Sequence, residues 1–478
     1  MTTTMESSLD GAPVPPVPHP TRAERRAAGK AARASTPFAA LDEVSTGVRQ
    51  DPVALLEQQA ASRVPELVPI RYGRMLVSPF TFYRGAALIM AADLASTPNS
   101  GLYTQLCGDA HMSNFGVYSS PERTLVFDVN DFDETHPGPF EWDVKRLAAS
   151  VAVAAAENGF SAKKVRAAVL ATVAGYREQM RSLAAVGNLA AWYSHENADD
   201  LTAGIGSMLD SARKTRWVAA LEKARTRDSV QALAKLTTRT NGVTAIRSDP
   251  PLVVPIEELL TPEQVPAAYE MFAQLIRPYR RTLQSDRRVL MEQFHLAHAA
   301  RKVVGVGSVG TRAWIFLFQG SDDADPLFLQ AKEAQTSVLA GRAKGPRWRN
   351  QGQRVVQGQH LLQASSDIFL GWQHAIGIDG QPRDFYLRQL RDGKGSVVVE
   401  TLVPDAMTVY GRVCGQALAR GHARGGDRVA IAAYLGSSDR FDNVIADYAA
   451  SYADQTVLDH AKLQVAVNTG QLTAVTGI

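Results

Sequence analysis

Hydrophobic residues follow the i, i+3, i+4 spacing of amphipathic helices over most of the chain between residues 143 and 290. The runs SAKKVRAAVLATVAGYREQMRSLAA and TPEQVPAAYEMFAQLIRPYRRTLQSD show it most clearly. Ser161 and Thr261 stand where helix N-caps are expected, and Pro262 stands at a first helical position. The spacing predicts an almost wholly helical region over 143–290 and further helices after Met407.

Alternating apolar positions, typical of strands, gather in several other places. The runs FGVY and TLVFDV flank the turn SSPE and predict a hairpin, after which a long helix starts at about Trp142. From residue 300, RKVVGVGSVGTRAWIFLFQGSDDADPLFLQAKEAQ predicts two strands around a turn, and QRVVQGQHLLQASSDIFLGW predicts a helix. RDFYLRQLRDGKGSVVVETL predicts another hairpin, turning at DGKG. The aromatic run Phe80, Phe82, Tyr83 predicts a strand before a helix rich in Ala, Leu and Met.

Composition places the chain among folded, water-soluble proteins, since it has 478 residues, 45% of them hydrophobic and 21% charged. The net charge is only +3, and part of the basic excess lies in TRAERRAAGKAARAS, so we expect no nucleic-acid partner. No apolar run reaches the roughly 20 residues that span a bilayer, so we expect no membrane partner. Two cysteines, Cys107 and Cys414, are too few for a disulfide framework or a zinc site and favour a cytoplasmic location. Residues 1–40, basic and rich in Pro, are expected to form a disordered arm.

Gly305, Gly307 and Gly310 form the pattern G-x-G-x-x-G, which occurs in dinucleotide-binding folds and in kinases. In the dinucleotide fold a helix follows the third glycine, whereas TRAWIFLF predicts a strand here. The motif therefore favours a hairpin whose glycines let backbone amides approach phosphates, with a hairpin that binds nothing as the alternative. Lys332 follows in the strand PLFLQAKEA, where it can pair with nucleotide phosphates or simply point to solvent.

The segment QLCGDAHMSNFGVY places Asn114 five residues after Asp109, the Asp-to-Asn spacing of phosphoryl-transfer loops. Such chemistry needs a carboxylate that takes the proton of the acceptor hydroxyl, here Asp109, and metal ligands, of which Asn114 is one. FDVNDFDE offers Asp128, Asp131 and Asp133 as further metal ligands, and we favour Asp131, with Asp133 beside it. A solvated acidic loop or a calcium-type oxygen site are the alternatives.

These motifs resemble the kinase superfamily, most closely its aminoglycoside phosphotransferase and choline kinase branch. There the loop reads H-G-D-x-H-x-x-N, against CGDAHMSN here, and the metal segment reads I-D-F-x-D, against NDFDE. The order is inverted, because the loop and metal segment lie at 108–133 and the glycine motif and lysine strand lie at 305–400. CGQALARGHARGG, near the end of the chain, resembles the helix that directly precedes the loop in those enzymes. The resemblance implies a circular permutation.

The implied fold is α+β: a two-lobed protein kinase-like fold, circularly permuted, with a large helical lobe and a smaller β-rich nucleotide lobe. The helical lobe would span 41–290, the nucleotide lobe 291–403, and the helices of 404–478 would complete the helical lobe. The chain beyond residue 40 is also identified as a member of a bacterial family, the domain of unknown function family 2252. Runs such as RYGRMLVSPFTFYRG, LCGDAHMSNFGVY and VGVGSVGTR carry that resemblance.

The kinase resemblance implies an ATP-dependent phosphotransferase that uses Mg²⁺ and acts on a hydroxyl of a small molecule, or else of a protein. His111, inside the loop, is assigned to phosphate contact, with a structural hydrogen-bonding role as the alternative. Two departures stand out: Cys107 replaces the usual histidine before Gly-Asp, and residues 334–399 contain no glutamate to pair with Lys332, which leaves Glu333 as the nearest candidate. The alternatives are a nucleotide-binding pseudokinase and adenylyl transfer to a protein.

Overall fold

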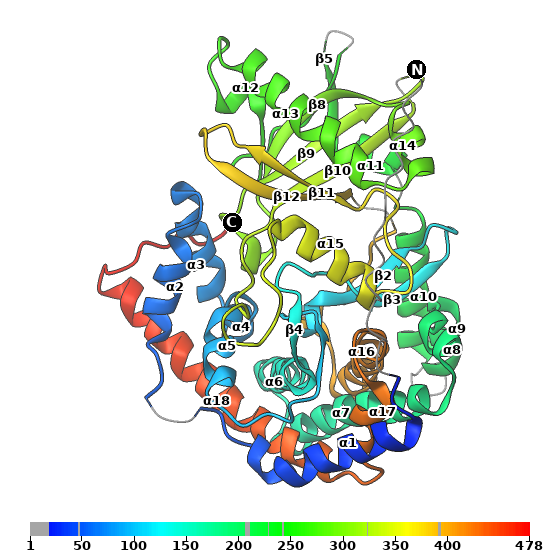
Figure 1. The fold of residues 1–478 in the computed structure, drawn as a ribbon. Helices are drawn as coiled ribbons and strands as arrows, with labels where there is room; N and C mark the ends of the chain where they lie inside the picture. Colours follow the sequence, from blue (N-terminus) through cyan, green and yellow to red (C-terminus); the bar gives the residue numbers. More distant parts are fainter. Residues whose placement is uncertain are drawn as a thin grey trace, which may run out of the picture.

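The computed structural model describes residues 19–45, 48–205, 211–227, 229–240, 243–322, 324–390 and 393–478. Helices and strands both occur, so the fold is a mixture of α and β structure. Figure 1 shows a β-rich part, drawn in green and yellow, above a larger helical part that contains both the blue and the red ends of the chain. Segments far apart in the sequence therefore share one helical body.

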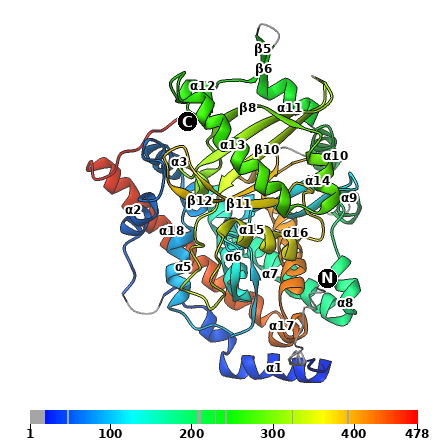
Figure 2. The same cartoon turned by 45° about the horizontal axis from the view of Figure 1, so that its top comes forward.

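The β-rich part is built on a six-stranded antiparallel sheet with the order β11-β12-β10-β9-β8-β7. On one face, Phe272 of α13 packs edge-on against Trp314 and Phe316 of β9. Figure 2 shows α13 lying across the sheet. The strands are β7 (Val253–Pro255), β8 (His295–Lys302), β9 (Ala313–Gln319), β10 (Pro326–Glu333), β11 (Gly371–Ile376) and β12 (Pro382–Gln389), and the helices of this part are α11 (Ser229–Leu236), α12 (Ile256–Leu259), α13 (Val265–Tyr279) and α14 (Ser285–Met291).

One further helix, α15 (Gln351–Leu362), packs on β11 and β12 and lies between the sheet and the helical part (Figure 1). Its first turn is capped by Asn350, whose side chain accepts from the amide of Gln353. Buried Val355 and Val356 belong to the main hydrophobic core, which is centred in the helical part. The helix thus ties the two parts of the molecule together.

The helical part surrounds α6 (Phe140–Glu157), whose residues are buried from Phe140 to Ala155 because other helices cover every side of it. The close contact of α7 with α16 depends on glycine: a Cβ at Gly415 would lie 2.1 Å from the carbonyl oxygen of Thr172. The remaining helices of this part are α1 (Arg22–Ser35), α2 (Pro52–Ala60), α3 (Val68–Leu76), α4 (Pro79–Gly85), α5 (Ala87–Ala95), α7 (Ala162–Ala185), α8 (Asn188–Tyr193), α9 (Ala198–Ile205), α10 (Ser211–Arg225), α16 (Pro404–Gly425), α17 (Arg428–Leu435) and α18 (Arg440–Asn468).

Two short two-stranded antiparallel sheets lie between the helices and the six-stranded sheet. In one, β1 (Tyr103–Leu106) pairs with β4 (His136–Pro139); in the other, β2 (Phe115–Ser119) pairs with β3 (Leu125–Val129) across the predicted SSPE turn. The segments 107–114 and 130–135, which carry the acidic motifs, connect these strands. The pairing therefore fixes both motif segments at one place in the fold.

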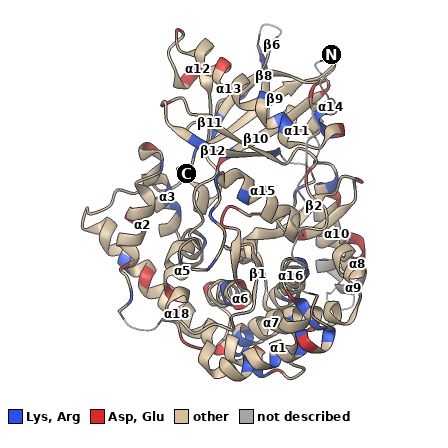
Figure 3. Ribbon diagram, in the orientation of Figure 1, with Lys and Arg blue, Asp and Glu red and all other residues tan. Residues whose placement is uncertain are grey.

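The prediction of a disordered arm over 1–40 is wrong from residue 19 onward, while residues 1–18 lie outside the described chain. Helix α1 begins after a capping box formed by Thr21 and Glu24, and it packs against α17. Gly29 allows this contact, because a Cβ there would lie 2.1 Å from the carbonyl oxygen of Ala430. Helix α1 is mostly basic and carries one acidic residue, Glu24 (Figure 3), so composition alone suggested a solvated tail.

The aromatic run Phe80, Phe82, Tyr83 was predicted as a strand but forms α4. Ser78 caps this helix and Pro79 occupies its first turn, so local capping outweighs the β preference of the aromatic residues. All three aromatic side chains are buried in the main core, and this burial stabilises the helix further.

The region 143–290 is less helical than predicted. Strands β5 (Thr237–Thr240) and β6 (Val243–Ile246) form a hairpin, and β7 adds to the edge of the sheet. Thr261 is not an N-cap, because α13 begins at Val265 after Gln264, although Ser161 does precede α7 as predicted. The boundaries at residues 41, 291 and 404 stay predictions.

The last predicted hairpin turns elsewhere. Strand β12 pairs with β11, across the turn at 377–381, and no strand follows it among the described residues before α16. Asp392, in the predicted DGKG turn, lies outside the described chain; Gly395 instead forms a bridge with Val117. In the described chain, no helix is both long enough and apolar enough to cross a membrane.

Candidate active site

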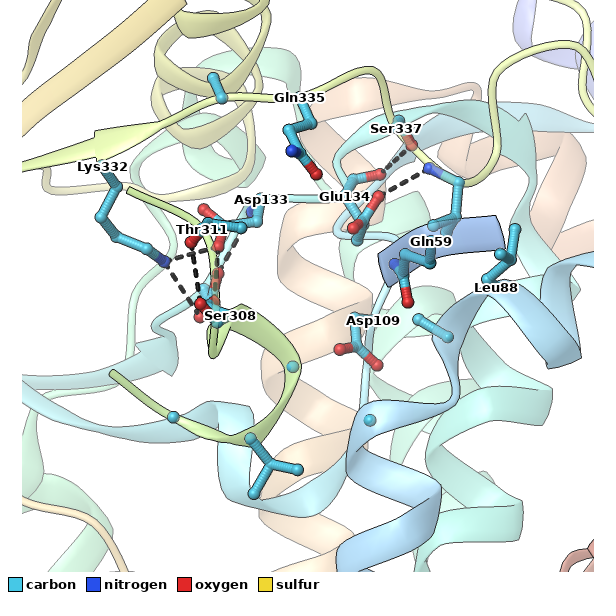
Figure 4. A pocket seen from close by; sticks show the side chains of 18 of the residues that line it. Gln59, Leu88, Asp109, Asp133, Glu134, Ser308, Thr311, Lys332, Gln335 and Ser337 are labelled. Atoms are coloured by element: carbon cyan, nitrogen blue, oxygen red, sulfur yellow. Dashed lines mark hydrogen bonds and ion pairs between the residues drawn. The ribbon is translucent and has the colours of Figure 1, made fainter. Parts of the chain in front are cut away.

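A cleft of about 590 Å³ lies where the β-rich part meets the helical part. The catalytic-loop candidates, the acidic segment, the glycine segment and the end of β10 all line it, together with residues from α2, α4 and α5. Figure 4 shows Lys332, Asp133 and Ser308 grouped on one side, Gln59 and Leu88 on the other, and Asp109 and Glu134 between them. The predicted residues that line this cleft are Asp109, His111, Asn114, Asp131, Asp133, Gly305, Gly307 and Lys332.

The glycine segment joins β8 to the antiparallel β9 and contains a single 3₁₀ turn, Val306–Ser308, so it does lie in a hairpin. Of its three glycines, only Gly310 has a positive φ, +88°, and a side chain there would also meet Arg63. Arg63 donates to the carbonyl oxygens of Val309 and, at 2.9 Å, of Gly307. The segment is thus fixed from outside the sheet, by the chain between α2 and α3.

Lys332 lies at the end of β10, 199 residues away from Asp133, and its ammonium group is 2.5 Å from the Asp133 carboxylate. Asp133 also accepts from Ser308 Oγ at 3.0 Å and from the Tyr386 hydroxyl at 2.6 Å. Asp131 is the second carboxylate near this lysine, at 3.9 Å. Burial by itself would raise the pKa of Asp133, but the ammonium group of Lys332 outweighs it and holds the pKa below its usual range.

Asp109 is held by Arg146 of α6, whose Nε donates to its Oδ1 at 2.9 Å and whose Nη2 lies 2.7 Å from the same oxygen in an ion pair. Burial raises the pKa of Asp109 to about 6, and the charge of Arg146 limits that rise. Nε2 of His111 is 3.8 Å from Oδ2 of Asp109, while its buried Nδ1 has no hydrogen-bond partner among the described residues. Burial also lowers the pKa of His111, which favours the neutral imidazole.

The backbone before Asp109 is held by Asp143, also on α6. Its carboxylate accepts from the amides of Cys107 at 2.7 Å and of Gly108 at 3.1 Å, and it lies 3.2 Å from Nε2 of His422. Gly108 has φ of +85°, a conformation that glycine adopts without strain. The cysteine that replaces the expected histidine is buried, and its main chain is fixed in the same network.

The oxygen donors of the cleft suit Mg²⁺, which takes one or two carboxylates and completes its coordination with water and phosphate. Asn114 donates its amide N–H to the carbonyl oxygen of Asp109, which fixes the side chain and leaves its amide oxygen as a possible ligand. Asp131 is 32% exposed in the cleft, whereas Asp133 is engaged by Lys332. Asp128 is buried on β3 and does not line the cleft. Throughout the described ranges, no group of three or more His, Cys, Asp or Glu side chains could hold a metal ion.

Comparison with known proteins identifies a family for this chain. The sequence model of the bacterial family described as "Uncharacterized protein conserved in bacteria (DUF2252)" matches residues 63–466. The chain belongs to the DUF2252 family. No curated protein and no solved structure matches it. The matched residues include the whole cleft apart from Gln58, Gln59 and Ser62, so the cleft belongs to the shared region of DUF2252.

In this DUF2252 protein, Glu333 does not pair with Lys332. It accepts from the amide of Arg312 at 3.0 Å and lies 3.5 Å from Arg383. On α15, Arg354 donates to the carbonyl oxygens of Asp133, Thr135 and Gln335, at 2.8, 2.7 and 2.8 Å. Helix α15, which follows the lysine strand along the chain, thus holds the acidic segment by that segment's main chain.

Three residues that line or support the cleft, Arg146, Glu134 and Arg63, were not predicted as site residues from the sequence. Arg146 follows Asp143 by three positions on a predicted helix, a spacing that puts both on one face, so this signal was present in the sequence. Glu134, which accepts from the amide of Val338 at 2.7 Å and whose pKa burial raises to about 7, directly follows the predicted acids. Arg63 has no local signal, because only the tertiary fold brings it to the glycine segment.

Proposed function

We propose that this DUF2252 protein is a phosphotransferase that moves the γ-phosphoryl group of ATP to a hydroxyl group of a small molecule, on a circularly permuted kinase-like fold. The single observation that carries the proposal is that residues from distant parts of the chain meet in one cleft. Asp109, Asn114, Asp131 and Lys332 line one cleft beneath the glycine segment, although about two hundred residues separate the acidic half from the lysine strand.

The position of α16 supports the permutation. Thr104 of β1, just before the loop, donates to the carbonyl oxygen of His422 near the end of this helix at 3.0 Å. A Cβ at Gly425 would lie 2.8 Å from the Cβ of Gln105. The end of α16 thus abuts the strand that leads into the loop, which is where the helix directly preceding that loop would end in an unpermuted chain.

In the proposed reaction, the acceptor oxygen forms a bond to the γ-phosphorus while the bond from that phosphorus to the β–γ bridging oxygen breaks and ADP leaves. Asp109 accepts the hydroxyl proton, and a pKa of about 6 leaves it mostly ionised at neutral pH. Lys332 and the amides of the glycine segment position the phosphates. Asn114 and Asp131 would hold Mg²⁺, which neutralises phosphate charge when bound.

A second candidate function, a nucleotide-binding pseudokinase, is favoured by one observation. Arg146 engages Oδ1 of Asp109 by a hydrogen bond from Nε and an ion pair from Nη2, which weakens that carboxylate as a proton acceptor. In this case the cleft binds nucleotide without turnover.

The test is incubation with Mg-ATP and a metabolite pool, together with calorimetric titration of Mg-ADP. Wild type is compared with Asp109→Ala and Asp131→Ala, and Asp128→Asn serves as the control because Asp128 lies outside the cleft. We expect ADP formation in wild type and in the control, and a loss of 10²-fold or more in Asp109→Ala, on the order expected for a catalytic base. Binding without product favours the pseudokinase, pyrophosphate release with AMP attached to a protein indicates adenylyl transfer, and absence of nucleotide binding rejects all three.

A further inference from the structure

Arg84, the penultimate residue of α4, is a cation in the cleft without a partner. Its Nε is buried, and no hydrogen bond or ion pair engages its guanidinium group within the described chain. Other basic groups of the cleft have partners: Lys332 pairs with Asp133, while Arg63 and Arg388 donate to main-chain carbonyl oxygens, although the Nε of Arg388 is also buried without a partner in the described chain. Because burying a charged group without a partner is costly, an unpaired arginine here indicates an anion that binds during function.

The surroundings of Arg84 suit an anion close to the reacting centre. The charges of Glu400 and, to a smaller extent, Asp109 act on Arg84 without a hydrogen bond or ion pair, and a Cβ at Gly307 would lie 3.3 Å from the Arg84 carbonyl oxygen. The next helix, α5, begins at Ala87 without a side-chain cap, and Ala87 and Leu88 line the cleft. The positive end of α5 thus adds to the field of the arginine.

A basic segment, residues 342–349, leads out of the same cleft. Arg342 lines the cleft, and the one hydrogen bond of its side chain in the described structure goes to the carbonyl oxygen of Val338, at 3.1 Å. Lys344, Arg347 and Arg349 follow and are exposed. The segment contains no acidic residue, and none of its four cations forms an ion pair with any described residue. Unpaired positive charge at the mouth of a cleft raises the local concentration of anionic ligands.

We propose that the acceptor is itself an anion: a small hydroxylated molecule whose phosphate or carboxylate group binds Arg84, with Arg342 lining the same cleft. The acceptor hydroxyl is then presented to Asp109, and the segment 342–349 attracts the molecule from solution. The statement that the bound anion accepts a phosphoryl group rests on the proposed function, but binding of an anion at Arg84 can be measured without any turnover.

The first experiment uses inorganic phosphate and Mg-ADP as separate probes of the full chain, by calorimetry. The variants are Arg84→Gln and Arg342→Gln, and the matched control is Arg281→Gln, an exposed arginine of the β-rich part. Arg84→Gln should weaken phosphate binding about tenfold or more and leave Mg-ADP binding within about twofold, since one charge-assisted hydrogen bond contributes on this scale. The control should change neither.

Equal phosphate affinity in wild type and Arg84→Gln would overturn the inference. Equal loss of phosphate and Mg-ADP binding would overturn it as well, because Arg84 would then hold nucleotide phosphates. If Arg84→Gln does not fold, Arg342→Gln, on a half-buried loop position, must show the selective loss of phosphate binding. If Mg-ADP does not bind wild type, the proposed function is rejected, but the phosphate titration still tests the anion site.

The second experiment identifies the acceptor class by turnover of matched pairs with Mg-ATP: glycerol against glycerol 3-phosphate, ribose against ribose 5-phosphate, and glycerol against glycerate. We expect the anionic member of a pair to have the higher kcat/KM, and Arg84→Gln to lower that value for the anionic member alone. The phosphate and carboxylate arms separate the two anion classes. Better turnover of the neutral members would refute the proposal.

Discussion

The ion pair between Lys332 and Asp133 joins the sheet to the acidic segment. The variant Lys332→Met tests how much this ion pair contributes to the free energy of unfolding. The Lys332 ammonium group is 3% exposed and 2.5 Å from the Asp133 carboxylate, a distance at which the attraction is about 7 kcal/mol for an effective dielectric constant of about 20. Desolvation of both groups offsets a large part of this.

Removal of one partner of a buried pair costs about 3–5 kcal/mol, because the other charge stays buried. Asp133 is 26% exposed and keeps its hydrogen bonds from Ser308 and Tyr386, so we expect the lower value, about 3 kcal/mol, for Lys332→Met. Lys332→Met combined with Asp133→Asn removes both charges, and we expect it to lose less free energy of unfolding than Lys332→Met alone.

The assay is urea unfolding of both single variants and the double variant at pH 7, which yields the coupling free energy. Lys163→Met, on the exposed face of α7, is the control, and we expect a change within about 0.5 kcal/mol. Because Lys332 holds the pKa of Asp133 below its unfolded value, the contribution of the pair is complete above about pH 4 and is lost as the pH falls through the folded pKa. A coupling below about 0.5 kcal/mol would refute this reasoning.

Three further changes test the cleft. Asp143→Asn leaves one acceptor oxygen for the two amides of Cys107 and Gly108, so we expect a loss of about 2 kcal/mol in urea unfolding and a lower kcat; unchanged values of both would contradict the scaffold role. Arg63→Ala removes the donors to the glycine segment, so amide hydrogen exchange should accelerate at 306–310 and not in α6, whereas equal exchange in both proteins would argue against a clamp. Burial raises the pKa of Asp109 to about 6, so kcat/KM should fall as the pH drops below 6, when the carboxyl is protonated; a pH–rate profile that stays flat from 5 to 8 would exclude Asp109 as the base.

Local chemistry explains which parts of the fold could be predicted. The glycine hairpin and the strand of Lys332 follow from alternating apolar residues on either side of glycine, and the structure contains both. Helix α4 was mistaken for a strand because its aromatic residues favour β structure, although Ser78 and Pro79 carried a start signal. Burial in the core decided between these two tendencies.

In the candidate site too, residues within short motifs could be predicted, and residues supplied by long-range packing could not. Spacing within short segments brought Asp109, Asn114 and Asp131 to attention, and they do line one cleft with Lys332. Arg63 could not be predicted as a cleft residue, because the carbonyl oxygens that it binds lie far along the chain. Long-range packing, which no local pattern encodes, supplies this group.

The contacts of Arg354 have a consequence for sequence drift in this family. Apart from one bond to the Gln351 side chain on its own helix, this arginine donates to main-chain oxygens, at positions 133, 135 and 335, and every amino acid supplies such an oxygen. The side chains at positions 133, 135 and 335 can therefore change without loss of these hydrogen bonds, whereas a change of Arg354 removes them. A side chain that binds another side chain usually requires both residues to change together in evolution. Here the connection requires that one residue, Arg354, be kept.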